Sequence, residues 1–205
     1  MAIQLAAVGL VVAYSVSPDF RAACAALAAI RERWGLAFSA LAGALAGGIL
    51  PVLLKWLLAP RTHRSPGPFR ERAVNLAFLV AFFAFNGIVV DSFYRQMARL
   101  FGSAPTVLTV IEKMAFDQFV FTPCWLPIII TLFTWQRSGF RVGATVEALR
   151  GDSYRRRVVP LLLPNWAFWI PMTAVIYALP GPLQFLLFAL ALAAWSLIMV
   201  FIAQG

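Results

Sequence analysis

The side chains best able to do chemistry lie in a short polar run within an otherwise apolar part of the chain. Lys113 and Asp117 are one helical turn apart in EKMAFDQFVFTP, so an amine and a carboxylate can pair on one helix face, with Gln118 beside them. Asp91 and Arg95 have the same spacing. Ionisable groups cost several kcal/mol in lipid and must therefore face protein or water. These groups could form a pore entrance or an ion-pair network that fixes neighbouring helices.

Further polar candidates for a pore are Tyr94, which follows Asp91, and Asn165, in a later apolar run. Helical rise separates Asn165 from Asp117 by roughly 15–20 Å across a membrane, too far for one catalytic constellation. The sequence has no Gly-rich phosphate loop, no G-x-S-x-G elbow and no histidine near an acid in an apolar run. We therefore expect no enzymatic activity.

Composition places these residues in a membrane protein. Hydrophobic residues make up 62% of the chain and charged residues only 12%, against about 45–50% and about 25% in soluble domains. The mean hydropathy is +0.84. No alternating period-2 pattern marks barrel strands, so helices are the only way to span a bilayer. The sequence predicts an all-α, polytopic transmembrane helix bundle.

Five apolar runs fit the roughly 20 residues that a helix needs to cross about 30 Å of hydrocarbon. They cover residues 36–58, 74–93, 116–135, 159–179 and 183–203. We expect four to five of them to span the membrane as a bundle domain of residues 36–205. Residues 1–35 form an N-terminal membrane-associated segment, in which 3–17 make a short apolar helix that either crosses or lies flat. That segment has no basic residue before its apolar run, which disfavours a cleaved signal.

Basic residues lie mostly in the connections between apolar runs. With five crossings, residues 55–72 and 137–157 hold eleven of the seventeen Lys and Arg on one side of the membrane, which the positive-inside rule places in the matrix or cytosol. A net charge of +9 also predicts contact with anionic lipids, cardiolipin among them. No basic stretch is interleaved with aromatics as in a nucleic-acid groove, so no nucleic-acid partner is expected.

Cysteine and histidine are too sparse for a metal or cofactor site. Cys24, Cys124 and His63 lie far apart in the sequence, without the spacing of metal ligands or of a disulfide framework. We expect no metal and no cofactor.

Small residues mark one face of the first long apolar run. Gly43 and Gly47 are one turn apart, and residues of this size let helix backbones approach closely in lipid. The stripe could serve packing within the chain or contact with a second copy or another subunit. Pro51, in the same run, predicts a kink.

Two ordered motifs resemble the Mpv-seventeen and peroxisomal membrane protein twenty-two family. The pattern K-x-x-x-D-Q-x-x-x-x-P is matched by Lys113, Asp117, Gln118 and Pro123, and N-W-x-x-W with a later proline by Asn165, Trp166, Trp169 and Pro171. A third family motif, G-P-x-x-H-x-W-Y, is present only in part. Asp91 stands where that motif has histidine.

The resemblance implies a four-span organellar membrane protein of the mitochondrial inner membrane or, alternatively, the peroxisomal membrane. Some members are described as weakly selective channels that affect metabolite balance. For this chain we therefore expect a channel-type protein that passes small solutes. The alternative is a non-catalytic accessory subunit of a larger, respiratory-type membrane complex, which the Gly43 and Gly47 stripe and the divergent motif residues favour.

Overall fold

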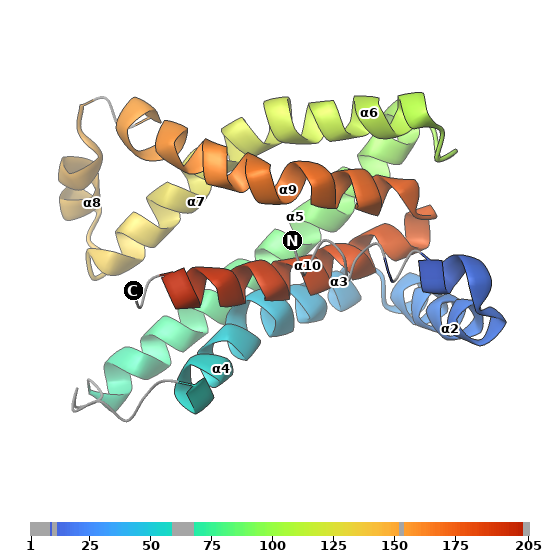
Figure 1. Ribbon diagram of the computed structural model, residues 1–205. Helices are drawn as coiled ribbons and strands as arrows, with labels where there is room; N and C mark the ends of the chain where they lie inside the picture. The colour runs from blue at the N-terminus through green and yellow to red at the C-terminus, as the bar shows by residue number, and fades with distance from the viewer. Residues whose placement is uncertain (1–8, 10–11, 59–67, 152–153, 203–205) are drawn as a thin grey trace. The chain divides into compact units, whose positions relative to one another are not determined.

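Long apolar helices dominate the computed structural model, which describes residues 9, 12–58, 68–151 and 154–202 (Figure 1). In those ranges the secondary structure is helical, without strands. Four helical segments are long and apolar enough to cross a membrane, namely Leu36–Leu54, Phe69–Phe101, Val107–Arg137 and Tyr154–Ala178. The predicted all-α membrane fold is thereby confirmed.

The fifth expected run corresponds to α10 (Gly181–Ile202), an apolar helix of 22 residues. The apolar helix expected over residues 3–17 falls largely on residues 1–8 and 10–11, outside the described part of the chain. Its position relative to the membrane remains a prediction.

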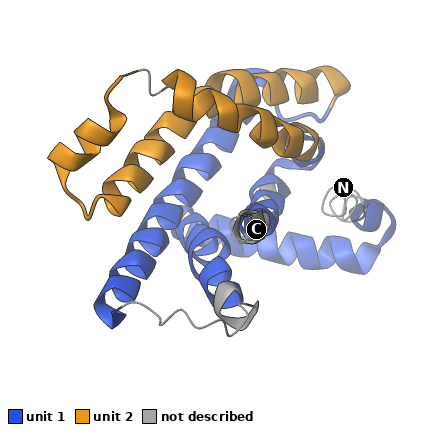
Figure 2. Ribbon diagram, turned by 60° about the vertical axis from the view of Figure 1, so that its left-hand side comes forward, with its two compact units in different colours: residues 1–105, 175–205 blue, residues 106–174 orange. Residues whose placement is uncertain are grey.

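The chain divides into two compact units, coloured separately in Figure 2. Unit 1 contains residues 1–105 and 175–205, and unit 2 contains residues 106–174. Unit 1 is built from α2 (Pro18–Trp34), α3 (Leu36–Gly43), the π-helix η1 (Ala44–Ile49), α4 (Leu50–Leu58), α5 (Phe69–Phe101) and α10. Unit 2 is built from α6 (Val107–Phe116), the π-helix η2 (Asp117–Phe121), α7 (Thr122–Arg137), α8 (Val142–Leu149), η3 (Tyr154–Val158) and most of α9 (Val159–Ala178).

Local sequence signals set the helix ends. Ser17 caps α2 by accepting from the Phe20 N–H at 3.2 Å, and Gly35, with φ 55°, separates α2 from α3. Gly102, with φ 87°, follows α5, and Thr106 caps α6 by accepting from the Thr109 N–H at 3.2 Å. Glycines with positive φ end helices, and Ser or Thr caps begin them, whether the neighbouring residues are polar or apolar.

Glycine allows α3 and α5 to pack backbone to backbone in unit 1. A Cβ added to Gly43 would clash with the Phe83 carbonyl oxygen and lie 3.1 Å from the Gly87 Cα, while one added to Gly87 would clash with the Ser39 carbonyl oxygen. Gly47 is covered by the Phe83 ring. Both glycines of the predicted stripe therefore face α5 of the same chain.

Pro51 follows a π-helical turn. In η1 the Leu50 N–H donates to the Leu45 carbonyl, five residues back. Proline and π-helical turns are both known causes of a kink in a helix.

Aromatic side chains fill the core of unit 1 where α10 packs on α5, η1 and α4. The Tyr94 ring meets the rings of Tyr177 and Phe188 edge-on, with centroids 5.4 and 5.9 Å away. Tyr94, a candidate pore residue, therefore lies in a buried aromatic cluster.

Candidate functional site

The polar run singled out in the sequence lies inside a membrane-crossing helix. Lys113, Asp117 and Gln118 are buried, with 2%, 6% and 2% of their surface exposed. The helix starts at the Thr106 cap, earlier than the expected run 116–135, so Lys113 lies within α6, and Asp117 and Gln118 directly follow α6. An amine, a carboxylate and an amide therefore occupy the interior of the Val107–Arg137 segment.

The helix changes geometry at these residues. The Asp117 N–H still donates to the Lys113 carbonyl, so the two side chains leave the helix one turn apart. Asp117 then begins η2, and at its end the Thr122 N–H donates to the Asp117 carbonyl, five residues back. π-Helical turns of this kind are rare and recur at functional sites.

Trp166 on α9 is bound directly to this turn. Its indole N–H donates to the Gln118 carbonyl at 2.9 Å, and its ring lies 5.3 Å from that of Phe119, centroid to centroid. A carbonyl in a widened turn needs a donor when no water can reach it. The two motifs that carry the family resemblance thus meet within unit 2, a contact that sequence spacing did not predict.

The Gln118 side chain is only partly satisfied. Its Nε2 donates to the Asp117 Oδ1 at 3.1 Å, whereas its buried Oε1 accepts no hydrogen bond from any described residue. A buried acceptor left unmatched costs about 1–3 kcal/mol. The site therefore offers an acceptor, beside a carboxylate and near a lysine, to a water molecule or a polar solute.

The other motif residues are less buried than Gln118. Asn165 and Trp169 are half-buried on α9, and Pro171, in the same helix, is exposed. Trp169 packs edge-on against Phe168, with ring centroids 5.1 Å apart. Pro123 is half-buried, and its carbonyl accepts from the Tyr154 hydroxyl at 3.4 Å.

Unit 1 contains a separate polar cluster centred on Asp91, which is fully buried. Ser39 Oγ donates to the Asp91 Oδ2 at 2.9 Å, and Arg95 donates to the same oxygen through Nε at 3.2 Å and Nη2 at 3.1 Å. Arg31 Nη2 donates to Oδ1. The expected Asp91–Arg95 pair is present, while the partners Arg31 and Ser39 were not predicted from the sequence.

Arg31 reaches Asp91 from α2 and is itself enclosed. Only 6% of its side chain is exposed, its guanidinium carbon lies 5.6 Å from the centroid of the Phe185 ring, and Nη1 donates to the Gly181 carbonyl at 3.4 Å. The Asp91 cluster therefore links α2, α3, α5 and the start of α10 within unit 1. From the sequence, one could infer only that an acid in an apolar helix requires a cationic partner, and not that this partner is Arg31.

Comparison of the chain with family models, with curated proteins and with solved structures found no match in any of the three.

Nothing in the described part of the chain gathers three or more His, Cys, Asp or Glu side chains as a metal site would. Cys24 and Cys124 are free thiols. The polar site of unit 2 can therefore act through hydrogen bonds and charge. The polar cluster of unit 1 is an ion-pair network centred on Asp91.

Proposed function

We propose that this membrane protein is a channel-type protein of the mitochondrial inner membrane. It passes small hydrophilic solutes, or supports metabolite homeostasis by that route, and catalyses no reaction. The observation that carries the proposal is the buried Gln118 Oε1, an acceptor without a protein partner in the described structure, inside a membrane-crossing helix.

The neighbours of Gln118 support a pathway for polar molecules. Asp117 and Lys113 are buried on the same helix, and a membrane span retains such groups where they face water or a substrate route. The π-helical turn at Asp117–Phe121 is held by Trp166, so the amide is presented by a fixed backbone. Hydrogen-bonding and charged groups that line a pore set the selectivity of a channel.

The organelle is proposed from charge and resemblance. The basic connections on one side fit a matrix-facing surface next to anionic lipids. The motif residues Lys113, Asp117, Gln118, Asn165 and Trp166 resemble a family of the mitochondrial inner and peroxisomal membranes, and the peroxisomal membrane is the alternative location. The proposed partners are the bilayer, its anionic lipids, and further copies or other membrane subunits.

Conductance of the purified protein in planar bilayers tests the proposal. We expect channel currents whose preference between cations and anions changes in Asp117→Asn. Asp19→Asn, an identical change at an exposed position on α2, should leave the preference unaltered. Absence of current at every voltage, or an unchanged preference in Asp117→Asn, would refute a channel that uses this site.

A second function, that of a non-catalytic accessory subunit, is favoured by the Asp91 cluster. This carboxylate is fully buried and bound by Arg31, Ser39 and Arg95, which suits a rigid scaffold. On a native gel in mild detergent, comigration with a respiratory assembly would support this role. Migration at the 22.6 kDa of the single chain plus detergent would count against it.

A further inference from the structure

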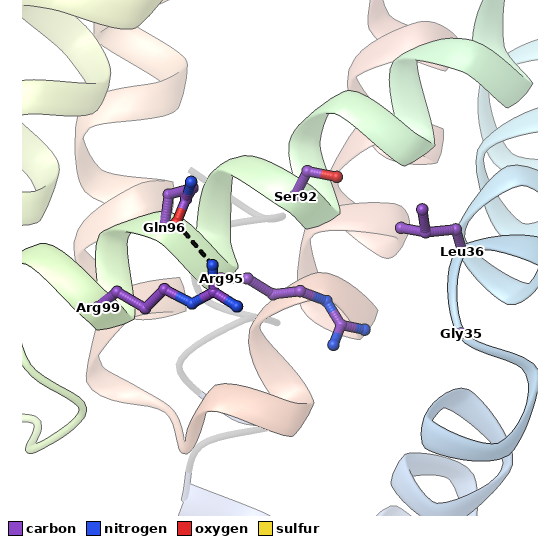
Figure 3. Close-up of a pocket in the computed structure, with 6 residues that line it drawn as sticks. All are labelled: Gly35, Leu36, Ser92, Arg95, Gln96 and Arg99. Carbon is purple, nitrogen blue, oxygen red and sulfur yellow. Dashed lines mark hydrogen bonds between the residues drawn. The ribbon is translucent and has the colours of Figure 1, made fainter.

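A groove in unit 1 combines positive charge with a position at the ends of two membrane-crossing helices. It is lined by Gly35, Leu36, Ser92, Arg95, Gln96 and Arg99, and has a volume of about 310 Å³. Figure 3 shows Arg95 and Arg99 extending from α5, with Arg95 directed toward Gly35 and Leu36. Among the described residues, the lining contains two guanidinium groups, an amide and a hydroxyl, and no acid.

Both guanidinium groups make hydrogen bonds within α5, and Arg95 is fixed by a buried partner. Arg95 is anchored through Nε and Nη2 to the buried Asp91, and its Nη1 makes no hydrogen bond to a described residue. Arg99 Nη1 donates to the Gln96 Oε1 at 3.2 Å. Pre-positioned guanidinium groups bind phosphate oxygens well, because their planar donors match the geometry of the anion.

Charge in this region is unbalanced. Arg31 already supplies a buried positive partner for Asp91, so Arg95 and Arg99 leave the cluster with an excess of two positive charges. The N-terminus of α3 adds to the positive potential, because Gly35 provides no side-chain cap for its free N–H groups. An anion bound in the groove would neutralise this excess.

The position of the groove favours the headgroup of a lipid. Leu36 is the first residue of the Leu36–Leu54 segment, and Arg95 and Arg99 lie in the last turns of Phe69–Phe101. Trp34, at the end of α2, is 54% exposed, as is common at the membrane–water interface. The apolar Leu36 side chain next to the arginines suits a headgroup joined to an acyl chain.

We propose that this groove binds a phosphate group, supplied by the headgroup of an anionic phospholipid or by a soluble phosphate. The proposal depends on the membrane location of the protein and not on solute passage, so it can fail while the channel proposal stands. Arg95 and Arg99 would donate to the phosphate oxygens, and Gln96 and Ser92 would complete the polar lining.

The test is the thermal stability of the purified full-length protein in neutral detergent during titration with phosphatidic acid, with phosphatidylcholine or with inorganic phosphate. We expect phosphatidic acid to raise the melting temperature and phosphatidylcholine to have no effect. Arg99→Gln should raise the phosphatidic acid concentration for half-maximal stabilisation about tenfold, because one charge-assisted contact is lost. Arg70→Gln, at an exposed arginine near the other end of α5, should leave that concentration unchanged.

Arg99 is exposed and bonded only to Gln96 among the described residues, so Arg99→Gln should fold normally. Arg99→Lys, which keeps the charge, should recover part of the affinity. Stabilisation by inorganic phosphate at similar concentrations, lost in Arg99→Gln, would support the site and assign it to soluble phosphates. Equal binding by wild type, Arg99→Gln and Arg70→Gln, or no response to either phosphate source, would overturn the proposal.

Discussion

The indole N–H of Trp166 lies 2.9 Å from the backbone carbonyl oxygen of Gln118 and donates to it, which ties α9 to the π-helical turn η2. The bond satisfies the backbone carbonyl of Gln118, whereas the side-chain Oε1 of Gln118 accepts no hydrogen bond from a described residue. The ring of Trp166 also packs on the ring of Phe119. The Trp166 side chain therefore contacts both the backbone of η2, at Gln118, and a side chain of η2, at Phe119.

Replacing Trp166 with phenylalanine removes the donor and keeps an aromatic ring. We expect a loss of about 1–3 kcal/mol in the free energy of unfolding, because the backbone carbonyl of the buried residue Gln118 is left without its donor. Unfolding by SDS titration in mixed micelles measures this change. Trp135→Phe makes the same chemical change at a residue that packs against Phe140 in unit 2, and should lose less. Equal losses in the two variants would show that the hydrogen bond does not hold the turn.

Asp91→Asn tests the closed network of unit 1. The carboxylate is fully buried and bonded to Arg31, and removing one partner of a buried ion pair costs about 3–5 kcal/mol, because the remaining charge is left uncompensated. Ser39→Ala removes only the hydroxyl donor, and should cost about 1.5–3 kcal/mol. The same SDS titration ranks the two. A loss below that of Ser39→Ala would mean that Asp91 is not the centre of the network.

Gly43→Ala tests the close approach of α3 and α5. An added methyl group would overlap the Phe83 carbonyl, and such overpacking costs about 1–3 kcal/mol. Gly143→Ala, on α8, adds the same group where nothing lies within 4 Å, and should be neutral or stabilising by up to about 1 kcal/mol. Thermal unfolding in detergent compares them. A Gly43→Ala protein as stable as wild type would argue against backbone contact at this crossing.

Apolar run length predicted the four long helices but not their ends. The expected run 74–93 stopped near Asp91, whereas α5 extends over Phe69–Phe101. Charged residues end an apolar run, but they do not end a helix. Gly102, with positive φ, and the Thr106 cap set the actual boundaries, so Asp91 and Lys113 came to lie within helices.

Local spacing predicted part of the candidate site. The Asp91–Arg95 pair is four residues apart and follows from helical periodicity. Arg31 lies 60 residues from Asp91, and Trp166 lies 48 residues from Gln118. No periodic pattern in a sequence predicts such tertiary contacts. The residue types also do not predict where a helix forms a π-helical turn.

The central claim is that the buried amide of Gln118 serves a route for polar molecules, and solute efflux from proteoliposomes measures it most directly. We predict efflux through the wild-type protein that falls about five- to tenfold in Gln118→Leu, the factor that corresponds to about 1–1.4 kcal/mol of lost hydrogen bonding. Gln184→Leu provides the control, because this buried glutamine of unit 1 donates to the Leu179 carbonyl, and its efflux per folded protein should match wild type. Wild-type vesicles that release no solute, or Gln118→Leu vesicles that release it at the wild-type rate, would contradict the claim.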